Sequence, residues 1–334
     1  MDDLRWFAPN RYCTLPVSAL RSLGLRIALE GDAPAGAAVA ADGQSAVAGF
    51  EYALAARCPL LVYLWDLPPW RLGRGKPDLI FHLGGRLRRI PRPLGGFPER
   101  AGNYSRIRYV ARRAAMVWSP SESTVRDVRA RFGVDAERIP FCYDSDRFGP
   151  ESRARSAGSR DPRVILSISR LVPHKNHAVI LRAAARLETR PLVRIIGQGP
   201  EADPLRLLAR DLDVHLDLAG TWASDQEVVE AYRNADVVVS PSRFEGFGLT
   251  PMEGLAMGLP VIASDIPPHR EFMGEAVRYF LPDDDISLAR GLSAVLAGRP
   301  VRDLAPPAAL SDLTIEACAR RFRPGLERLL RSRQ

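Results

Sequence analysis

Short apolar runs alternate with amphipathic helical patterns along the whole chain. Runs such as RVILSIS (163–169), VVVSPS (237–242) and LPVIAS (259–264) are rich in β-branched residues and almost continuously apolar. Strands buried on both faces of a parallel sheet have this composition. The order of strands and helices therefore predicts βαβ units and an α/β fold, with helices on both faces of parallel sheets.

The expected elements follow from this alternation. Strands are expected near residues 4–8, 24–29, 36–40, 59–65, 115–119, 138–142, 163–169, 192–197, 214–220, 237–242 and 259–264. Helices are expected near residues 15–22, 44–57, 103–113, 121–132, 175–187, 201–211, 225–234, 249–257 and 286–297. The tail 311–332 predicts one or two further helices, with a break at Pro324 because proline removes a helical hydrogen bond.

A segment without apolar periodicity divides the chain. GPESRARSAGSRDP (149–162) is rich in Gly, Pro, Ser and Arg, which is typical of a linker. A length of 334 residues suits two domains at about 150 residues each. We therefore expect Rossmann-like domains over 1–148 and 163–310, a linker over 149–162 and a helical tail over 311–334. Ligands of open parallel sheets bind beyond the carboxyl ends of strands, so a cleft between the two domains is the expected site.

Composition excludes several other classes of protein. Hydrophobic residues make up 46% and charged residues 26%, too balanced for a disordered or fibrous chain. No run of about 18 apolar residues predicts a membrane span, and the first residues show no secretion signal. The 4 cysteines lie far apart without a CxxC pair, which favours reduced thiols in a cytoplasmic protein.

The positive charge is concentrated in the first half. Residues 1–150 carry 22 basic and 15 acidic side chains, whereas residues 151–334 carry 25 and 24. Within the first half, the stretch 71–113 holds 12 basic and 2 acidic residues. Three interpretations compete: a solvated face, a nucleic-acid surface, or attraction to an anionic membrane or a lipid-diphosphate acceptor. We favour peripheral association with the inner face of the membrane and expect no nucleic acid as partner.

Two cations follow the strand at 163–169. Arg170 and Lys175 lie just before and at the start of the next expected helix, in the stretch SISRLVPHKNH. Lys175 is one of only two lysines in the chain, the other being Lys76. A helix start offers free N–H groups, and with a guanidinium and an ammonium it suits a diphosphate.

Two carboxylates flank a glycine-rich turn after the strand at 237–242. Glu245 lies in the loop FEGFG, and Glu253 lies eight residues later in a helix that begins near Thr250. The backbone N–H groups of Gly248, Leu249 and Thr250 are placed to meet a phosphate. Carboxylates in such a loop accept hydrogen bonds from sugar hydroxyls. The helix dipole alone explains an acid at Glu253, but it does not explain Glu245.

Several long motifs occur together in one order. They are SRLVPHKNH, IIGQGPEADPLRLLA and LAGTWASDQEVVEAYRNADVVVSPSRFEGFGLTPMEGLAMGLPVIASD, preceded by AAMVWSPSESTVRDVRARFG in the first half. Together they resemble the retaining glycosyltransferases of family 4, which have the GT-B fold. The E-x7-E pair formed by Glu245 and Glu253 is the most specific part of the resemblance. In this fold, the C-terminal helix usually returns to the first domain.

The resemblance implies roles for individual residues. Arg170 and Lys175 would neutralise the donor diphosphate, with backbone contacts from residues 248–250. Glu245 and Phe247 would face the donor sugar, and Glu253 would hold the ribose hydroxyls. Gly220 and Trp222 belong to the loop that usually lines the nucleobase; Trp222 either stacks on the base or packs in the protein.

The first half departs from the family pattern. APNRYCTLP (8–16) lacks the glycine-rich turn, so Asn10 and Arg11 are the candidate phosphate-side substitutes. LLVYLWDLPPW (60–70) has Trp65 where many members have a histidine, and Asp66 follows it. Asp66 is either a catalytic group or a turn-forming acid.

The function that follows is metal-independent, retaining transfer of a hexose. A GDP- or UDP-linked sugar is the expected donor, and a glycan or lipid-linked molecule of polysaccharide or glycolipid assembly is the expected acceptor. We expect no metal and no cofactor, because the cations meet the leaving group and acidic runs such as Asp283–Asp285 suit turns. His174 and His177 are expected to be solvated, and His269 to be structural. The alternatives are a nucleotide-sugar-binding protein without transfer activity and a nucleic-acid-binding protein.

Overall fold

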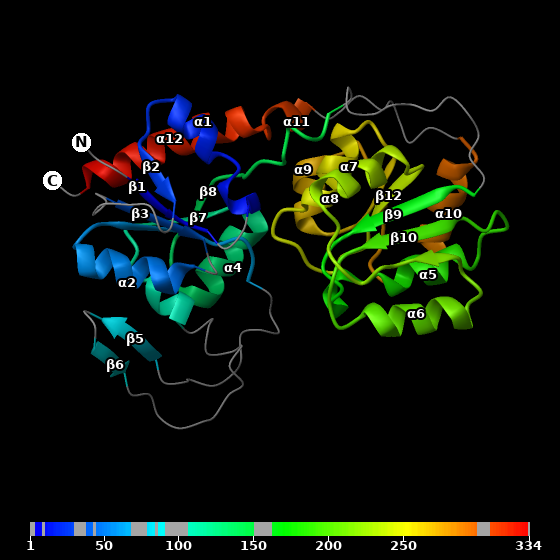
Figure 1. Ribbon diagram of the computed structural model, residues 1–334, viewed down its shortest axis with the longest axis horizontal. Helices are drawn as coiled ribbons and strands as arrows, with labels where there is room; N and C mark the ends of the chain where they lie inside the picture. Colours follow the sequence, from blue (N-terminus) through cyan, green and yellow to red (C-terminus); the bar gives the residue numbers. More distant parts are fainter. Residues whose placement is uncertain are drawn as a thin grey trace. The chain divides into compact units, whose positions relative to one another are not determined.

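The computed structural model describes residues 4–8, 11–29, 38–42, 45–67, 79–83, 86–90, 106–149, 162–298 and 308–332. The chain forms two compact units (Figure 1). The first contains Met1–Cys142 together with Leu313–Gln334, and the second contains Tyr143–Asp312. The C-terminal tail therefore joins the first unit, as the resemblance implied.

The first unit is built on a six-stranded sheet whose strands are all parallel. The order across it is β2-β1-β3-β4-β7-β8. The strands are β1 (Leu4–Phe7), β2 (Ile27–Leu29), β3 (Ala38–Asp42), β4 (Leu60–Tyr63), β7 (Met116–Ser119) and β8 (Glu137–Arg138). Every residue of β3 and β4 is buried, which explains their continuous apolar character.

Helices cover both faces of this sheet (Figure 1). They are η1 (Arg11–Thr14), α1 (Val17–Ser22), α2 (Ala46–Ala56), a helix over 106–111, α4 (Glu122–Phe132) and α12 (Ile315–Arg331). The predicted serine cap of α4 is confirmed, because the Ser121 side chain accepts the backbone N–H of Thr124. Gly133 ends this helix with a φ of 65°, a left-handed conformation that glycine adopts without strain.

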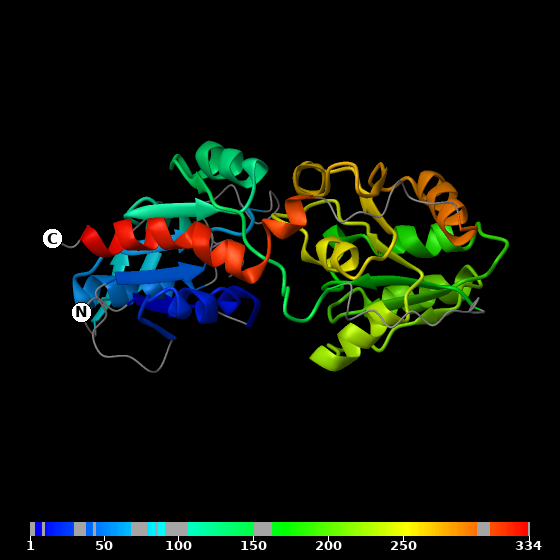
Figure 2. The same ribbon diagram turned by 90° about the horizontal axis from the view of Figure 1, so that it is seen from above.

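The expected break at Pro324 is wrong, because α12 continues through it to Arg331. The helix lies along the sheet of the first unit (Figure 2), and Phe322 packs edge-to-face on Trp118 with ring centres 5.1 Å apart. Gly325 lies so close to Trp118 that an added Cβ would sit 2.2 Å from its ring. Packing of the buried face therefore outweighs the hydrogen bond lost at an exposed proline.

An antiparallel hairpin of β5 (Leu79–Leu83) and β6 (Arg86–Ile90) was not anticipated. It lies beside α2 (Figure 1). The hairpin falls in the basic stretch 71–113, where the short apolar run LIFHL of β5 is followed by the basic sequence RLRRI of β6. The side chains of 71–105 lie outside the described residues, so membrane attraction by this stretch stays a prediction.

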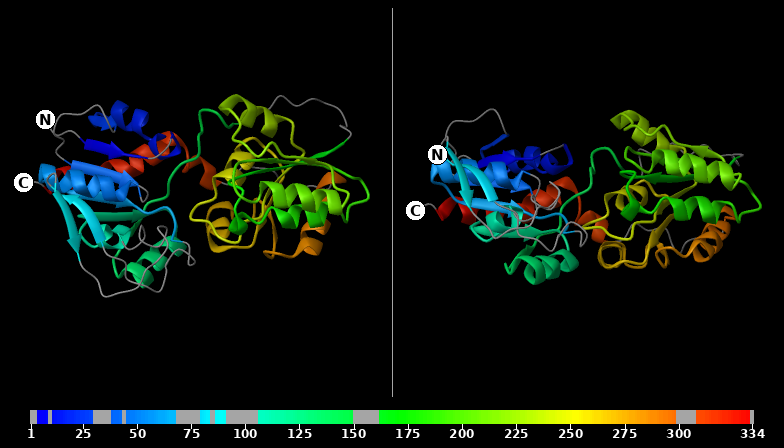
Figure 3. Two further views of the ribbon diagram at one scale, coloured as in Figure 1. Left: turned by 60° about the horizontal axis from the view of Figure 1, so that its bottom comes forward. Right: turned by 90° about the horizontal axis from the view of Figure 1, so that it is seen from below.

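The second unit repeats the architecture with another parallel six-stranded sheet (Figure 3). Its order is β11-β10-β9-β12-β13-β14. The strands are β9 (Val164–Ile168), β10 (Leu192–Ile196), β11 (Leu216–Asp217), β12 (Val237–Ser240), β13 (Val261–Ser264) and β14 (Arg278–Phe280). The sequence did not predict β14, which has only three residues and one buried side chain.

Alternate residues of β12 face opposite helical layers. Val237 and Val239 join the core formed with α5, α6 and α10, whereas Val238 lies against Gly254 of α8. The helices of this unit are η4 (Pro173–Lys175), α5 (Ala178–Ala184), α6 (Ala202–Asp211), α7 (Asp225–Arg233), α8 (Leu249–Ala256), α9 (Pro267–Met273), α10 (Asp285–Leu296) and α11 (Ala308–Ser311). The sequence did not predict α9, which begins at two consecutive prolines.

The strand order reverses once in each sheet. In the first unit the chain runs from β1 outward to β2 and then returns to β3 on the other side of β1. In the second it runs from β9 to β10 and β11 and then returns to β12 beside β9. Ligands of open α/β sheets bind beyond the carboxyl ends of the strands at such reversals. The two Rossmann-like sheets are thus confirmed, and each offers one position for a ligand.

Candidate active site

An ion pair joins the two loops at the reversal of the second sheet. Lys175 ends η4, shortly after β9, and Glu245 lies in the loop after β12. The Lys175 Nζ lies 2.6 Å from the Glu245 Oε1. Their side chains are only 12% and 16% exposed, so the pair is well shielded from water. The structure therefore brings together the expected phosphate lysine and the expected sugar carboxylate.

The carboxylate of Glu245 is held in its ionised form. Burial by itself would raise the pKa of Glu245, but the nearby charge of Lys175 and hydrogen bonds from Lys175 and Ser242 outweigh it. The pKa therefore lies below its ordinary value. The Ser242 Oγ donates to the same Oε1 at 2.8 Å, which also fixes the direction of the side chain. Glu245 is thus an oriented acceptor for hydroxyl protons.

Further hydrogen bonds lock the two loops to each other. The Arg243 Nη1 donates to the carbonyl oxygen of Pro173 at 2.6 Å, and its Nε donates to Asp283 at 2.9 Å. The Asn176 Nδ2 donates to the carbonyl oxygen of Pro241 at 3.2 Å. Asn176 adopts a φ of 58°, which asparagine tolerates better than most residues. The site is therefore preorganised, and no sequence motif indicated this role of Arg243.

Two histidines pack beneath the loops as neutral groups. The prediction that His177 is solvated is wrong: it is buried, with its Nε2 3.0 Å from the Ser169 Oγ. Burial and, next, the charge of Lys175 lower the pKa of His177 to about 3. His269 is fully buried, and burial likewise lowers its pKa. Because both histidines are neutral, they add no positive charge next to the Lys175 ammonium.

The start of α8 offers backbone groups rather than side chains. Gly248 precedes the helix with a φ of 96°, and an added Cβ would lie 3.1 Å from the His269 ring. The Thr250 hydroxyl already donates to the carbonyl oxygen of Ile168 at 2.6 Å. Leu249 is the first residue of the helix. The unpaired N–H groups of a first helical turn remain the features that suit an anion.

The side chain of Phe247 does not face outward. It is buried and packs edge-to-face on Phe272, with ring centres 4.5 Å apart. The family resemblance implied that Phe247 faces the donor sugar. In the structure its ring anchors the loop, so only its backbone is available to a ligand.

Glu253 is buried within α8 and bonded inside the protein. It is 4% exposed, and the Tyr232 hydroxyl donates to its Oε2 at 2.8 Å. Burial raises the pKa of Glu253 to about 7, with Asp144 raising it further and Tyr232 and Arg147 lowering it. The carboxyl group thus titrates near neutral pH. These three partners come from distant parts of the sequence, and no local pattern indicated them.

The remaining donor-side residues are more open. Arg170 is exposed, and its guanidinium has no hydrogen bond or ion pair within the described part of the chain. Trp222 is 52% exposed, which excludes the alternative that it packs in the core. Gly220 has a φ of 78°, as the turn before Trp222 requires. An exposed cation and an exposed aromatic ring are therefore available to a ligand of this unit.

The first-unit candidates are only partly described. Asn10 lies outside the described residues, and of Arg11 only the backbone, in η1, is described. Asp66 follows β4 and is half-buried. Within the described ranges, no three His, Cys, Asp or Glu side chains form a group that could hold a metal ion. Among those same residues, no helix is long and apolar enough to cross a membrane.

Comparison with known proteins finds relatives among glycosyltransferases. Residues 150–306 match the family model "Glycosyl transferases group 1". Over 175 residues the chain is 32% identical to a GDP-mannose-dependent alpha-(1-6)-phosphatidylinositol monomannoside mannosyltransferase of Mycolicibacterium smegmatis, covering 47% of this chain and 46% of the relative. It is 30% identical over 167 residues to the O-antigen chain mannosyltransferase RfbU of Salmonella typhimurium, covering 49% and 46%. The chain thus spans about half the length of these curated relatives.

The likeness in structure extends over nearly the whole chain. A sucrose-phosphate synthase from Thermosynechococcus elongatus superposes with a TM-score of 0.77 at 14% sequence identity, covering 99% of this chain and 100% of that one. At this identity the likeness establishes the fold alone, which is GT-B, as expected. Residues 150–306, which carry Lys175, Glu245 and Glu253, therefore form a domain of the glycosyl transferases group 1 family.

Proposed function

We propose that the protein is a retaining, metal-independent glycosyltransferase that moves a hexose from a nucleoside-diphosphate sugar to a glycan or lipid-linked acceptor. The observation that carries the proposal is the shielded Lys175–Glu245 pair at the strand reversal of the family domain. The bond to be broken joins a phosphate to a sugar. The Lys175 cation suits the phosphate, and the oriented Glu245 carboxylate beside it suits a sugar hydroxyl. Cell-surface polysaccharide or glycolipid assembly is the setting that the names of the relatives support.

When the donor binds, it would separate Lys175 from Glu245 and become the new partner of both side chains. Its phosphate oxygens bind the Lys175 ammonium, and a sugar hydroxyl donates to the freed Glu245 carboxylate. Neither charge is then left buried without a partner, which would be costly. The exposed Arg170 and the first N–H groups of α8 stabilise the negative charge that develops on the departing diphosphate. This set of cations supplies the charge stabilisation for which other enzymes use Mg²⁺.

Retention follows from attack on the same face as the departing phosphate. A phosphate oxygen takes the proton of the acceptor hydroxyl, so no protein base is needed. Glu245 stays ionised beside Lys175, since its pKa is below the ordinary value, and it orients the sugar by accepting its hydroxyl. This assignment separates sugar positioning from proton transfer.

GDP-mannose is the first donor to examine, because two relatives are mannosyltransferases and one is described as GDP-mannose-dependent. UDP-linked hexoses are the second choice. The exposed ring of Trp222 suits stacking on a nucleobase of either kind. A phosphoinositol lipid or a lipid-linked glycan is the corresponding acceptor class, reached from the membrane surface by the basic stretch 71–113.

The test is a transfer assay with membrane lipids as acceptor source and with GDP-mannose, UDP-glucose and UDP-galactose as donors, in the presence of EDTA. The wild type is expected to release the nucleoside diphosphate and label a lipid or glycan with the α-anomer. Glu245→Gln is expected to bind the donor and lose transfer. Donor binding without release or transfer for every donor would favour a nucleotide-sugar-binding protein. Release that requires a divalent metal would contradict the metal-independent part.

Membrane attraction has a separate test. Liposomes that contain anionic lipid are expected to carry the protein upward in a flotation gradient, whereas neutral liposomes are not. Flotation that ignores the lipid charge would contradict the role of the basic stretch while leaving the transfer proposal intact.

A further inference from the structure

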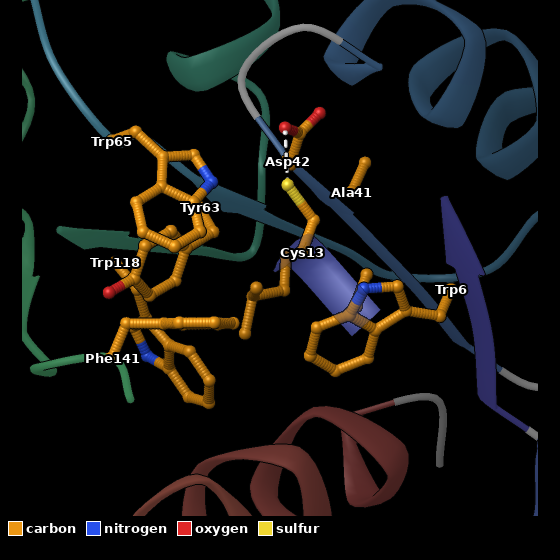
Figure 4. A pocket seen from close by; sticks show the side chains of 10 residues that line it. Trp6, Cys13, Ala41, Asp42, Tyr63, Trp65, Trp118 and Phe141 are labelled. Carbon is orange, nitrogen blue, oxygen red and sulfur yellow. Dashed lines mark hydrogen bonds between the residues drawn. The ribbon is translucent and has the colours of Figure 1, made fainter. Parts of the chain in front are cut away.

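A small pocket lies at the strand reversal of the first sheet, in the unit that does not contain the Lys175–Glu245 pair (Figure 4). Its volume of about 10 Å³ suits one water-sized group. It is lined by three tryptophans, a tyrosine and a phenylalanine together with a leucine, two alanines, a cysteine and an aspartate. The residues that carry the argument are Cys13, Asp42, Tyr63, Trp65 and Phe141. β1 and β3 both contribute to it, so it occupies the position where open sheets bind ligands.

The pocket contains a hydrogen-bond donor that has no acceptor in the part of the chain that the structure describes. The Trp65 Nε1 is buried and has no hydrogen-bond partner among the described residues. In Figure 4 this nitrogen lies on the side of the indole that faces Cys13 and Asp42. A buried N–H without an acceptor is costly, and such groups in native structures are usually met by a water or a ligand. An oxygen atom in the pocket would therefore supply the acceptor that the Trp65 N–H lacks.

The opposite wall supplies a carboxylate. Asp42 is the last residue of β3 and is 4% exposed. Its Oδ1 accepts the backbone N–H of Ser45 at 2.8 Å, and its Oδ2 accepts the Cys13 thiol at 3.4 Å. Each carboxylate oxygen can accept more than one hydrogen bond. A hydroxyl group, like a water molecule, can accept from an indole and donate to a carboxylate at the same time.

The walls of the pocket are rigid. The Trp65 ring packs on Phe141 with ring centres 4.5 Å apart and on Tyr63 at 5.1 Å. The Tyr63 hydroxyl donates to the carbonyl oxygen of Ile139 at 2.7 Å. Phe322 of α12 packs on the same rings, with its ring centre 5.6 Å from that of Phe141. The indole N–H is thus held in one direction before any ligand arrives.

We propose that this pocket binds one hydroxyl group of the acceptor, a sugar or cyclic polyol. The hydroxyl oxygen accepts from the Trp65 Nε1, and its proton is donated to the Asp42 carboxylate. The aromatic rings meet the C–H groups around that hydroxyl, while the small volume and the carboxylate exclude a phosphate. As a subsite for the acceptor, the pocket rests on the proposed function; as a hydroxyl-binding site, it stands on its own geometry.

The test uses ¹⁹F NMR of the full chain labelled with 5-fluorotryptophan. The chain has 5 tryptophans, and Trp65→Phe and Trp222→Phe assign the two resonances that matter. Methyl α-D-mannopyranoside and myo-inositol are titrated to about 100 mM, with inorganic phosphate as control and GDP as the donor-side probe. We expect the Trp65 resonance to shift with a sugar or polyol and not with phosphate, and the Trp222 resonance to shift with GDP.

Calorimetry gives an independent readout. Trp65→Phe keeps an aromatic ring but removes the N–H, so it should weaken binding of the same sugar about tenfold, the loss expected for one hydrogen bond. The matched variant Trp222→Phe should bind that sugar as the wild type does. Both variants should keep the wild-type circular dichroism.

Each failure points to a different proposal. A Trp65 resonance that ignores every sugar while Trp222 responds to GDP overturns the pocket and leaves the donor site standing. Equal sugar affinity of Trp65→Phe and the wild type also overturns the pocket. A response of Trp65 without any effect of GDP supports the hydroxyl site and contradicts the proposed function.

Discussion

Glu253 makes the stability of the second unit depend on pH. Its carboxyl group is buried and accepts a hydrogen bond from Tyr232, with Asp144 nearby. Burial raises its pKa from the ordinary value of 4.5 to about 7. Folding therefore favours the protonated form. The protonated carboxyl group therefore contributes to the stability of the folded state, and this contribution is fully present below pH 4.5 and is lost as the pH rises through about 7.

The size of the effect follows from the two pKa values. A rise from 4.5 to about 7 corresponds to about 3 kcal/mol of unfolding free energy once the group is fully ionised. Glu253→Gln removes the ionisation and keeps an oxygen that accepts from the Tyr232 hydroxyl. The stability of this variant relative to the wild type should therefore increase by about 2–3 kcal/mol between pH 5 and pH 8.5.

The measurement is urea unfolding of the wild type and Glu253→Gln at several pH values, followed by circular dichroism. Glu188→Gln, at an exposed position, is the matched control and should follow the wild type at every pH. If the difference between Glu253→Gln and the wild type does not change with pH, Glu253 is ionised throughout and the account of its burial is wrong. A difference that grows toward low pH would contradict it more strongly.

Three further substitutions test other contacts. Lys175→Met leaves Glu245 shielded without a cation and should cost about 1–3 kcal/mol in urea unfolding, most of it recovered in Lys175→Met/Glu245→Gln. Gly325→Ala drives a Cβ into the Trp118 ring and should cost about 1–3 kcal/mol with a changed near-ultraviolet circular dichroism. Trp222→Ala should weaken nucleotide binding about tenfold in calorimetry with the unfolding free energy unchanged, because the ring is largely exposed.

Each of these has a matched control in the chain. The exposed pair Arg190–Asp213 should show a coupling below about 1 kcal/mol in the same double-substitution experiment. Arg320→Ala, on the exposed side of α12, should leave stability nearly unchanged. Leu207, 51% exposed, is the control for Trp222, and Leu207→Ala should not affect the nucleotide. Equal effects at test and control positions would contradict the assigned contacts.

The continuous apolar runs between helical patterns predicted most strands of both sheets, because the strands β3, β4, β9, β12 and β13 are buried along their whole length. The runs at 163–169 and 237–242 are short, apolar and rich in β-branched residues, which favours strands in the interior of a sheet. The same rule failed for β14, whose three residues bury only Phe280. A different rule failed at Pro324, where the helix-breaking effect of proline is outweighed by packing of α12 on Trp118.

In the candidate site, the sequence predicted the position of residues that follow strands, but it did not predict contacts between residues that are far apart in the chain. Lys175 and Glu245 could be found because each follows a recognisable strand, and parallel strands bring their carboxyl ends to one edge. Their direct ion pair could not be predicted, because it depends on loop conformations fixed by Arg243. The sequence also could not predict that the indole N–H of Trp65 is buried without a hydrogen-bond partner among the described residues, since this depends on how the side chains pack.

Binding of GDP in EDTA, measured by isothermal titration calorimetry, tests the central claim most directly. The claim is that the Lys175 ammonium leaves Glu245 and binds the donor diphosphate without a metal. The account predicts that the wild type binds GDP more tightly than GMP, and that Lys175→Met/Glu245→Gln, which keeps the site free of a buried charge, loses at least about tenfold in GDP affinity. No GDP binding by the wild type, or equal affinity of the wild type and the double variant, would contradict it.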